Sequence, residues 1–248
     1  NKKAVKTITD DTQMTLFGFE AIRHIIDDGG EYLVKENFEQ EYANWWLTQT
    51  NKPFHPGINH PLLKEKMMFS VKAPGITCMK SCYEIYHHGQ ALENDSYGCG
   101  SVMRLLPICE LFSRSDDLSQ IKRIAALSCL TTHKHSWNIQ ASDTLIDTFY
   151  KIYHERPIEN VKADKISEIG EGWSAQECVD MAIWAYNTSS SFSEMLVKAI
   201  CHSGDSDSVA AVSGALWGMS MKPLDLEIGF LEKEFIQEYY LEYFSDTI

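Results

Sequence analysis

The chain has 248 residues, 44% of them hydrophobic and 23% charged, which is the composition of a globular protein large enough to bury a sizeable core in one domain or two. Its formal net charge of −13 at pH 7 argues against nucleic-acid binding, because no stretch rich in Lys and Arg offsets it. No apolar run approaches the ~18 residues of a membrane span, and no signal peptide is visible. The seven scattered cysteines are typical of reduced, buried thiols, so we expect a cytoplasmic protein with no nucleic-acid or membrane partner.

Helical periodicity dominates the chain, whereas no segment shows a sustained two-residue alternation. The first predicted helix follows Asp11, carries an apolar stripe from Met14 to Ile26 and ends at Gly29-Gly30. Further helices are predicted over residues 38–47, 77–88, 101–112, 118–130, 138–154, 175–186, 192–200, 209–219 and 233–244. Pro107 would kink or shorten the helix over 101–112. Loops are predicted over 51–61, 93–100 and 155–171, and we expect an all-α fold in a single domain over residues 1–248.

Two clusters of carboxylates and hydroxyls lie near opposite ends of the chain, Thr9-Asp10-Asp11-Thr12 and Gly204-Asp205-Ser206-Asp207-Ser208. Each cluster is followed at once by an apolar, helix-like segment. Carboxylate and hydroxyl oxygens are ligands that suit Mg²⁺, Ca²⁺ or Mn²⁺ rather than zinc. If folding brings the two clusters together, they can hold a pair of divalent cations.

The simpler interpretation is that each cluster only caps a helix, since Asp and Thr are common N-caps. A cap needs one side chain, however, and here several are stacked. Asp205 and Asp207 are two residues apart, so they would face different sides of a regular helix and converge only from a turn or a first helical turn. Several carboxylates would also outweigh the positive end of the helix dipole, which opposes a bound cation.

Three other polar segments could carry chemistry. The loop over 94–101 has glycines ahead of a predicted helix, which either let backbone N–H groups approach a phosphate or only form a helix-entry turn. Arg104, one turn further on, could pair with a phosphate or with a core carboxylate. His133 and His135 could bind a metal or a ligand, or cap a helix. Trp173 could be a stacking platform or a core ring, and Glu177 could be a plain first-turn acid.

A zinc site is the alternative for Cys78 and Cys82, which are four residues apart and have His87 and His88 nearby. The pattern of two spaced ligand pairs is absent. Buried thiols are therefore the preferred interpretation.

Taken together and in order, these segments resemble the ADP-ribosylglycohydrolase family, of the dinitrogenase reductase-activating glycohydrolase type. The resemblance runs through most of the chain, and six motifs carry it. They are Thr9-Asp10-Asp11-Thr12-Gln13-Met14, Ala73-Pro74-Gly75-Ile76-Thr77-Cys78, Gly98-Cys99-Gly100-Ser101-Val102-Met103-Arg104-Leu105-Leu106-Pro107, Thr132-His133-Lys134-His135, Gly172-Trp173 with Glu177, and Gly204-Asp205-Ser206-Asp207-Ser208 with Gly214-Ala215-Leu216. One match would be modest, whereas six in the right order are highly specific.

The resemblance implies an orthogonal all-α fold and a binuclear centre that holds two Mg²⁺ ions, or Mn²⁺ in their place. By position, the metal ligands would be Thr9, Asp10, Asp11, Asp205, Asp207 and Ser208. The family cleaves the bond between the ribose anomeric carbon of ADP-ribose and a protein side chain, often arginine. The cations would grip ribose hydroxyls and orient a water, while carboxylates would serve an oxocarbenium-like transition state.

The resemblance also implies ligand-binding and catalytic residues. The backbone of Gly98, Cys99, Gly100 and Ser101 would hold the pyrophosphate, His133 would contact phosphate or ribose, and Trp173 and Glu177 would complete the ligand site. Asp11 and Asp95 would act in catalysis, Asp95 from a position where some relatives place an acid over the ribose. Relatives begin with a glycine-rich helix that bears a glutamate near the anomeric centre, and we expect that helix to be missing from residues 1–248.

We therefore expect an Mg²⁺-dependent hydrolase that removes ADP-ribose from mono-ADP-ribosylated protein side chains, with arginine as the acceptor. It would either reverse a regulatory modification or act as an immunity protein against an ADP-ribosyltransferase toxin. Its partners would be the modified protein, ADP-ribose and, in the second case, the toxin. A non-catalytic protein that binds ADP-ribose or a partner on the same fold is the first alternative, and another binuclear hydrolase, such as a phosphoesterase, is the second.

Overall fold

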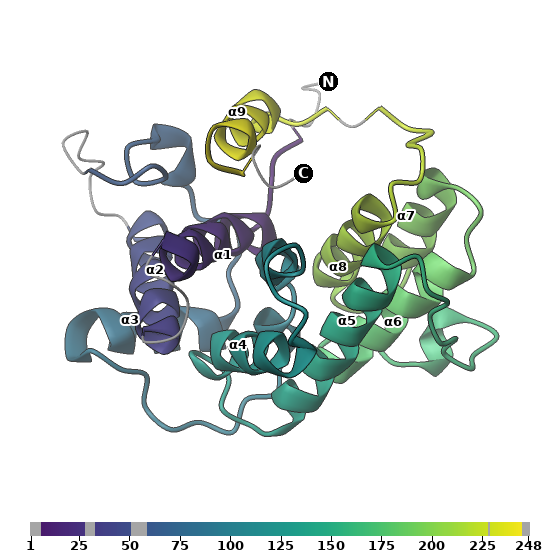
Figure 1. Cartoon of the computed structure of the whole chain (residues 1–248), viewed down its shortest axis with the longest axis horizontal. Coiled ribbons are helices and arrows are strands. Elements are labelled where there is room, and N and C mark those ends of the chain that lie inside the picture. Colours follow the sequence, from purple (N-terminus) through teal and green to yellow (C-terminus); the bar gives the residue numbers. More distant parts are fainter. Residues whose placement is uncertain (1–5, 28–32, 51–58, 228, 245–248) are drawn as a thin grey trace.

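The computed structural model describes residues 6–27, 33–50, 59–227 and 229–244. In these ranges the chain forms helices and loops and contains no strand, so the all-α class predicted from the periodicity is confirmed (Figure 1). The α-helices are α1 (Asp10–Asp27), α2 (Val34–Thr48), α3 (Ile76–His88), α4 (Leu118–Leu130), α5 (Trp137–Tyr153), α6 (Ala175–Asn187), α7 (Phe192–Ile200), α8 (Ser206–Met219) and α9 (Lys233–Phe244). Short 3₁₀ helices are η1 (Lys66–Met68), η2 (Cys99–Ser101), η3 (Leu106–Leu111) and η4 (Ile166–Glu168). None of the described helices is long and apolar enough to cross a membrane.

The helix boundaries follow the predicted pattern closely, and two helix starts matter for the site. α4, α7 and α9 have the predicted bounds, and α3, α5 and α6 differ from them by one residue. α1 begins at Asp10 and α8 at Ser206, so both acidic clusters reach into a first helical turn, where carboxylates interact favourably with unpaired N–H groups. The predicted helix end at Gly29-Gly30 and most of the predicted loop over 51–61 lie outside the described residues.

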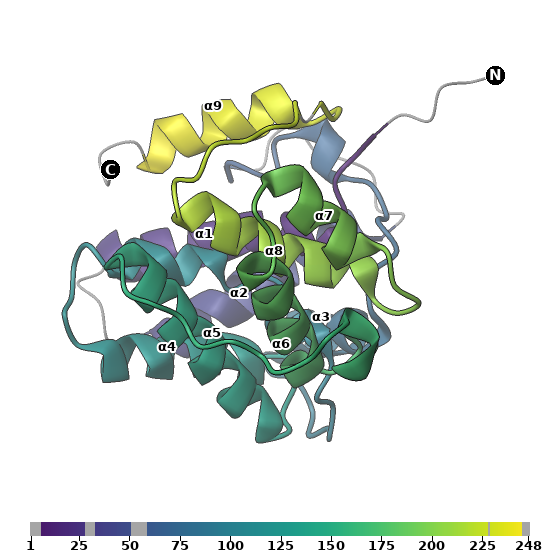
Figure 2. The same cartoon turned by 90° about the vertical axis from the view of Figure 1, so that its right-hand side faces the viewer.

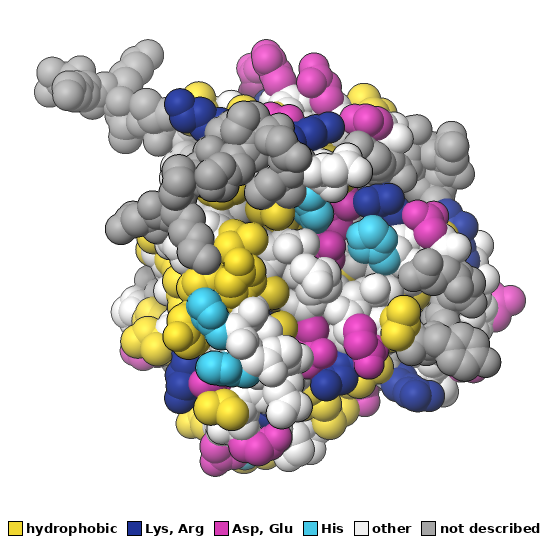
Figure 3. All heavy atoms as spheres, turned by 90° about the vertical axis from the view of Figure 1, so that its left-hand side faces the viewer, with side chains coloured by type: hydrophobic (Ala, Val, Ile, Leu, Met, Phe, Trp, Pro, Cys, Tyr) yellow, Lys and Arg dark blue, Asp and Glu magenta, His cyan; other side chains and the backbone are white. Residues whose placement is uncertain are grey.

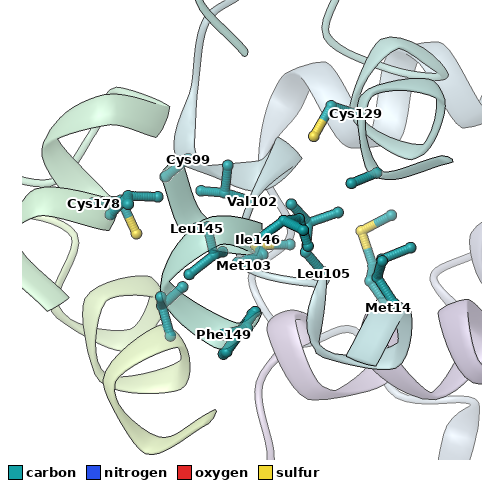
Figure 4. Packing of buried hydrophobic residues seen from close by; sticks show 14 of the residues in the cluster. Met14, Cys99, Val102, Met103, Leu105, Cys129, Leu145, Ile146, Phe149 and Cys178 are labelled. Carbon is teal, nitrogen blue, oxygen red and sulfur yellow. The ribbon is translucent and has the colours of Figure 1, made fainter. Parts of the chain in front are cut away.

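The single helix predicted over 101–112 is wrong, because this segment forms η2 and η3 with a turn between them. Pro107 has no N–H group with which to continue a helix, and it lies in the first turn of η3 instead. The turn puts Val102 and Leu105 into the core at 1% and 0% exposure. Figure 4 shows this turn packed on α5 and α1 through Val102, Met103, Leu105, Leu145, Ile146, Phe149 and Met14.

The helices form two groups that meet along α1 and α8. α1, α2 and α3 contact one another in that order on the left of Figure 1, and α5, α6, α7 and α8 pack together on the right. α4 joins the groups because it contacts both α2 and α5, and α1 touches α8 directly. One hydrophobic cluster takes in buried side chains from α1 to α9. The single domain over 1–248 stays a prediction, since it extends beyond the described residues.

α9 lies across one end of the molecule (Figure 2) and is tied to the segment that leads into α1. Glu232, the residue before α9, is 1% exposed. Its carboxylate accepts hydrogen bonds from the Thr7 hydroxyl at 2.5 Å and from the Ile8 N–H at 3.2 Å. Lys72 pairs with the same carboxylate at 3.3 Å. These contacts fix the backbone just ahead of the first acidic cluster.

The zinc alternative at α3 is not formed. Cys78 and Cys82 belong to the hydrophobic core, whereas His87 lies at the surface and packs against the exposed ring of Tyr83, with 4.4 Å between ring centroids. Figure 3 shows hydrophobic side chains gathered beside histidines on this side of the molecule. In the described ranges, no group of three or more potential metal ligands includes a cysteine or a histidine, and all seven cysteines are free thiols.

Asn138, in the first turn of α5, joins two loops from a fully buried position. Its amide nitrogen donates to the carbonyl oxygens of Ser96, His133 and His135 at 2.8, 3.2 and 2.9 Å. Its amide oxygen accepts a hydrogen bond from the Ser101 hydroxyl at 2.8 Å. One side chain therefore holds the loop over 96–101 against the loop over 131–136.

Replacing Asn138 by Leu keeps the size of the side chain and removes all four hydrogen bonds. Because two of these bonds are buried and the other two are half-buried, we expect the free energy of unfolding to fall by about 2–4 kcal/mol, measured by chemical denaturation. Asn187→Leu removes one solvent-exposed hydrogen bond to the Glu159 carbonyl and should change it by less than about 1 kcal/mol. Equal losses in the two variants would contradict the role given to Asn138.

Candidate metal and ligand site

The two acidic clusters meet at the N-terminal ends of α1 and α8. Asp10 and Asp11 lie in the first turn of α1, and Asp207 lies in the first turn of α8. One carboxylate oxygen of each lies within 4.8 Å of the other two. Asp10 and Asp11 are 5% and 2% exposed, whereas Asp207 is open to solvent. The structure thus brings together three of the six predicted metal ligands in one tight group, and their ligand role stays a prediction.

Asp11 has one oxygen with a hydrogen-bond partner and one without. Its Oδ2 accepts from the Thr9 hydroxyl at 2.7 Å, whereas its buried Oδ1 has no hydrogen-bond partner in the described structure. A buried carboxylate oxygen without a partner is unfavourable. A divalent cation would supply the missing partner, and the all-oxygen donor set around it fits Mg²⁺ or Mn²⁺.

Burial and mutual repulsion raise the pKa values of the carboxylates in the cluster. Burial, together with the charges of Asp11 and Asp207, raises the pKa of Asp10 to about 7. Burial also raises the pKa of Asp11, and the charge of Asp207 adds to that shift. The pKa of Asp205 rises to about 6 because of burial and its contact with Asp207. Protons therefore compete with a cation for these oxygens near neutral pH.

Asp205, the N-cap residue of α8, is held by a thiol. The Cys99 Sγ donates to the Asp205 Oδ2 at 2.6 Å, and Cys99 itself is 8% exposed in η2. The carboxylate of Asp205 lies outside the tight group of three but lines the same cavity. The resemblance gives Cys99 a role only through its backbone. The contact of its thiol with Asp205 could not be predicted from the sequence, because the two residues are 106 positions apart.

A short ladder of backbone hydrogen bonds assembles the walls of the cavity. The Cys99 N–H donates to the Trp173 carbonyl at 2.9 Å, and the Ala175 N–H donates to the Tyr97 carbonyl at 2.8 Å. On its other side the same loop accepts a bond from the Asp205 N–H to the Glu171 carbonyl, at 2.8 Å. The loop over 170–175 therefore lies between the glycine loop and the start of α8.

These segments enclose a cavity of about 500 Å³. Carboxylates line one wall, and glycines with a histidine line another. The lining residues are Asp10, Asp11, Ala73, Gly75, Ile76, Thr77, Cys78, Gly98, Cys99, Gly100, Met103, His133, Trp173, Gly204, Asp205, Ser206, Asp207 and Ser208. Ten of the predicted site residues thus reach one cavity, although they come from five separate stretches of the chain.

Some of the groups predicted to bind the pyrophosphate already form hydrogen bonds within the protein. The Cys99 N–H bonds to the Trp173 carbonyl, and the Ser101 N–H bonds to the Gly98 carbonyl at 3.3 Å. The buried Ser101 hydroxyl donates to Asn138 rather than into the cavity. Among the described residues, the N–H groups of Gly98 and Gly100 have no acceptor, and the ring of His133, which is 2% exposed, lies on the same wall.

Three predicted residues lie elsewhere or have another local role. The side chain of Asp95 is 94% exposed beside His135, at 3.7 Å, and does not line the cavity. Glu177 forms a capping box with Ser174 at the start of α6 and lines a second hollow of about 510 Å³. Trp173, 58% exposed, borders both spaces. Their catalytic or ligand-binding roles stay predictions.

An all-α fold that gathers carboxylates from two helix starts in one cavity defines a candidate cation site. The sequence model of the ADP-ribosylglycohydrolase family matches residues 2–147 and 139–222. The chain belongs to this family, which confirms the resemblance drawn from the motifs, and the family match does not specify the dinitrogenase reductase-activating type.

Two known proteins are similar to this chain over most of its length. An uncharacterised protein of Archaeoglobus fulgidus is 23% identical over 263 residues, which span 93% of this chain and 77% of that protein. A solved structure of an ADP-ribosylglycohydrolase-related protein complex superimposes with a TM-score of 0.64 at 18% identity, over 98% of this chain and 83% of that one. The second likeness concerns the fold, which is the all-α fold that the motifs implied.

Asp10→Asn should change how the stability of the metal-free protein depends on pH. The pKa of Asp10 is about 7 in the folded protein and near 4 in the unfolded chain, so the folded state binds more protons in that window. The free energy of unfolding should therefore fall as the pH rises from about 4 to 7, and Asn at position 10 should flatten this slope. Denaturation in EDTA at several pH values measures it. Asp164→Asn, at an exposed position, is the control, and an unchanged slope in the Asp10 variant would refute the prediction.

Gly204→Ala should disrupt the start of α8. A Cβ at Gly204 would lie 1.6 Å from the Glu171 carbonyl oxygen, which is backbone and cannot give way without moving Asp205. We expect a loss of about 2–3 kcal/mol in unfolding free energy and weaker Mn²⁺ binding by calorimetry. Gly214→Ala, with nothing within 4 Å of the new Cβ, should be neutral or stabilising by up to about 1 kcal/mol. Similar losses in both variants would contradict this account.

Proposed function

We propose that this chain hydrolyses the bond between the ribose of ADP-ribose and a modified arginine side chain, with two divalent cations, Mg²⁺ or Mn²⁺. Membership of the ADP-ribosylglycohydrolase family supports hydrolase activity of this type. The observation that carries the proposal is the convergence of Asp10, Asp11 and Asp207 in a cavity whose other wall holds uncharged donors.

The two walls suit the two ends of an ADP-ribose group. The diphosphate would lie against the uncharged donors of Gly98, Gly100 and His133. The terminal ribose would then lie over Asp10 and Asp11. The cavity of about 500 Å³ is of a size that encloses part of such a ligand.

The carboxylates would do the chemistry at the anomeric carbon. Asp10, Asp11, Asp205 and Asp207, with the hydroxyls of Thr9 and Ser208, would hold the cations, which when bound neutralise the cluster and supply sites for ribose hydroxyls and a water. As the bond to the guanidino nitrogen breaks, positive charge develops on the ribose ring, and the negative charge of Asp11 would stabilise it. Water would add its hydroxyl group to the anomeric carbon and its proton to the leaving guanidino nitrogen.

The biological role has two candidates within this activity. Removal of ADP-ribose from arginine would reverse a regulatory modification of a protein, or it would act as immunity against an ADP-ribosyltransferase toxin. In either case the partner is an ADP-ribosylated protein, and the acidic surface with net charge −13 favours target proteins with a basic face around the modified arginine.

Asp11→Asn should lower ADP-ribose release from mono-ADP-ribosylated arginine protein by about 100-fold or more, because it removes a charge from the centre of the cluster. The assay measures free ADP-ribose with Mg²⁺, with Mn²⁺ and with EDTA, and EDTA should abolish release. Asp164→Asn is the matched control at an exposed position. No release by the full-length protein with any divalent metal would reject the proposal.

The surface position of Asp95 supports one second candidate, a non-catalytic protein that holds ADP-ribose or a modified partner. Without an acid over the ribose, the cavity would bind and not turn over. Calorimetry separates the two functions: tight ADP-ribose binding that Asp205→Ala leaves unchanged, together with no release in the assay, would favour the binding protein. Asp95→Asn with reduced release would instead favour the enzyme and a catalytic role for Asp95.

A further inference from the structure

Arg104 is a buried cation for which the proposed chemistry has no direct use. It is 1% exposed, and within the described part of the chain it forms no ion pair with a carboxylate. Its guanidinium donates to the Ser128 carbonyl at 3.1 Å and to the Thr132 hydroxyl at 2.6 Å, and it lies 4.1 Å from the centre of the Tyr42 ring. Because a buried charge without a counter-charge is unfavourable, core packing alone explains its position poorly.

The Thr132 hydroxyl links this cation to His133. Thr132 is fully buried, and its Oγ1 lies 2.6 Å from an Arg104 nitrogen and 2.8 Å from the His133 Nδ1. Arginine can only donate, so the hydroxyl oxygen accepts from Arg104. Its hydrogen has no other acceptor among the described residues and must point to Nδ1, which is then unprotonated. The proton of the neutral ring is therefore on Nε2.

The Nε2 of His133 lies over the glycine loop at the wall of the cavity. A Cβ built on Gly100 would be 3.3 Å from this nitrogen, and one built on Gly98 would be 3.5 Å from it. The lack of side chains at both positions therefore leaves the N–H uncovered. Nε2 has no hydrogen-bond partner in the ranges that the structure describes, so an N–H donor of fixed direction faces the cavity.

We propose that Arg104 and Thr132 are positioning residues that hold His133 in its Nε2-protonated, neutral form as a hydrogen-bond donor to the diphosphate of the ligand. The identity of that ligand rests on the proposed function, whereas the protonation of the ring does not. A chain of hydrogen bonds that begins at a cation strengthens its last donor. Burial and the charge of Arg104 lower the pKa of His133 to about 3, so the ring stays neutral although the opposite wall is acidic.

The protonated nitrogen can be read from the ¹⁵N chemical shifts of the His133 ring in the ligand-free, full-length protein at pH 7, assigned with His133→Asn. We expect Nε2–H in the wild type and in Thr132→Ser, and a loss of that preference in Thr132→Val, which keeps the side-chain size. Thr131→Val is the matched control, because the buried Thr131 hydroxyl donates to the Leu127 carbonyl at 2.8 Å and not to His133. A proton on Nδ1 in the wild type, or an unchanged ring in Thr132→Val, would overturn the proposal.

Calorimetry with ADP-ribose then tests the donor role. Affinity should fall about tenfold in Thr132→Val, recover in Thr132→Ser and stay unchanged in Thr131→Val. Equal affinity in all three variants would overturn the donor role of His133. A wild type that shows the expected ring protonation, loses it in Thr132→Val and binds no ADP-ribose would overturn the ligand assignment and the proposed function, and it would still support the positioning by Arg104 and Thr132.

Discussion

Mutual repulsion among carboxylates is the constraint around which this fold is organised. Asp10, Asp11 and Asp207 bring three acidic oxygens within 4.8 Å of one another, and two of these residues are almost fully buried. Desolvation and like charge both oppose this arrangement. The positive ends of two helix dipoles offset part of this unfavourable free energy. While no cation is bound, the favourable free energy of the large hydrophobic core has to offset the remainder. A rigid frame is therefore needed to keep the oxygens at a distance at which they repel.

Backbone geometry provides that frame. The start of α8 lies so close to the loop over 170–175 that only glycine fits at position 204, and the same loop is bonded to η2 on its other side. Asn138 then holds η2 against the loop that bears His133. The carboxylate wall and the donor wall are thus connected by main-chain hydrogen bonds and by one buried side chain, so the cavity does not depend on exposed, flexible side chains for its shape.

Local patterns were sufficient for the helices and for part of the site. The apolar stripes give α4, α7 and α9 their full bounds, because helical periodicity is a property of consecutive residues. The meeting of Asp10 with Asp207 could be anticipated from residue type, since both clusters hold more oxygen ligands than a helix cap requires. The segment over 101–112 could not be predicted from such patterns. Val102 and Leu105 pack toward α5 and α1, and this tertiary packing is not recorded in the periodicity of the segment.

The contacts between distant loops were beyond the reach of the sequence. Asn138 has the appearance of an ordinary polar residue at a helix start, and its four partners come from other loops. Asp95 sits in a motif-like position, yet the path of its loop leaves the side chain at the surface. Arg104 suits either a phosphate or a carboxylate by residue type, and the folded chain gives it a carbonyl, a hydroxyl and an aromatic ring instead.

The hydrogen bond between the Glu232 carboxylate and the Ile8 N–H joins residues 224 positions apart. The group of Asp10, Asp11 and Asp207 likewise needs α8 to be in place, which matters for the order in which the molecule folds. Contacts of such long sequence separation form late, because chain closure must precede them. During synthesis, which proceeds from the N-terminus, the first acidic cluster leaves the ribosome without its counterpart. A growing polypeptide therefore carries Asp10 and Asp11 as ordinary solvated acids, and the complete cluster arises only when the translation of α8 is finished.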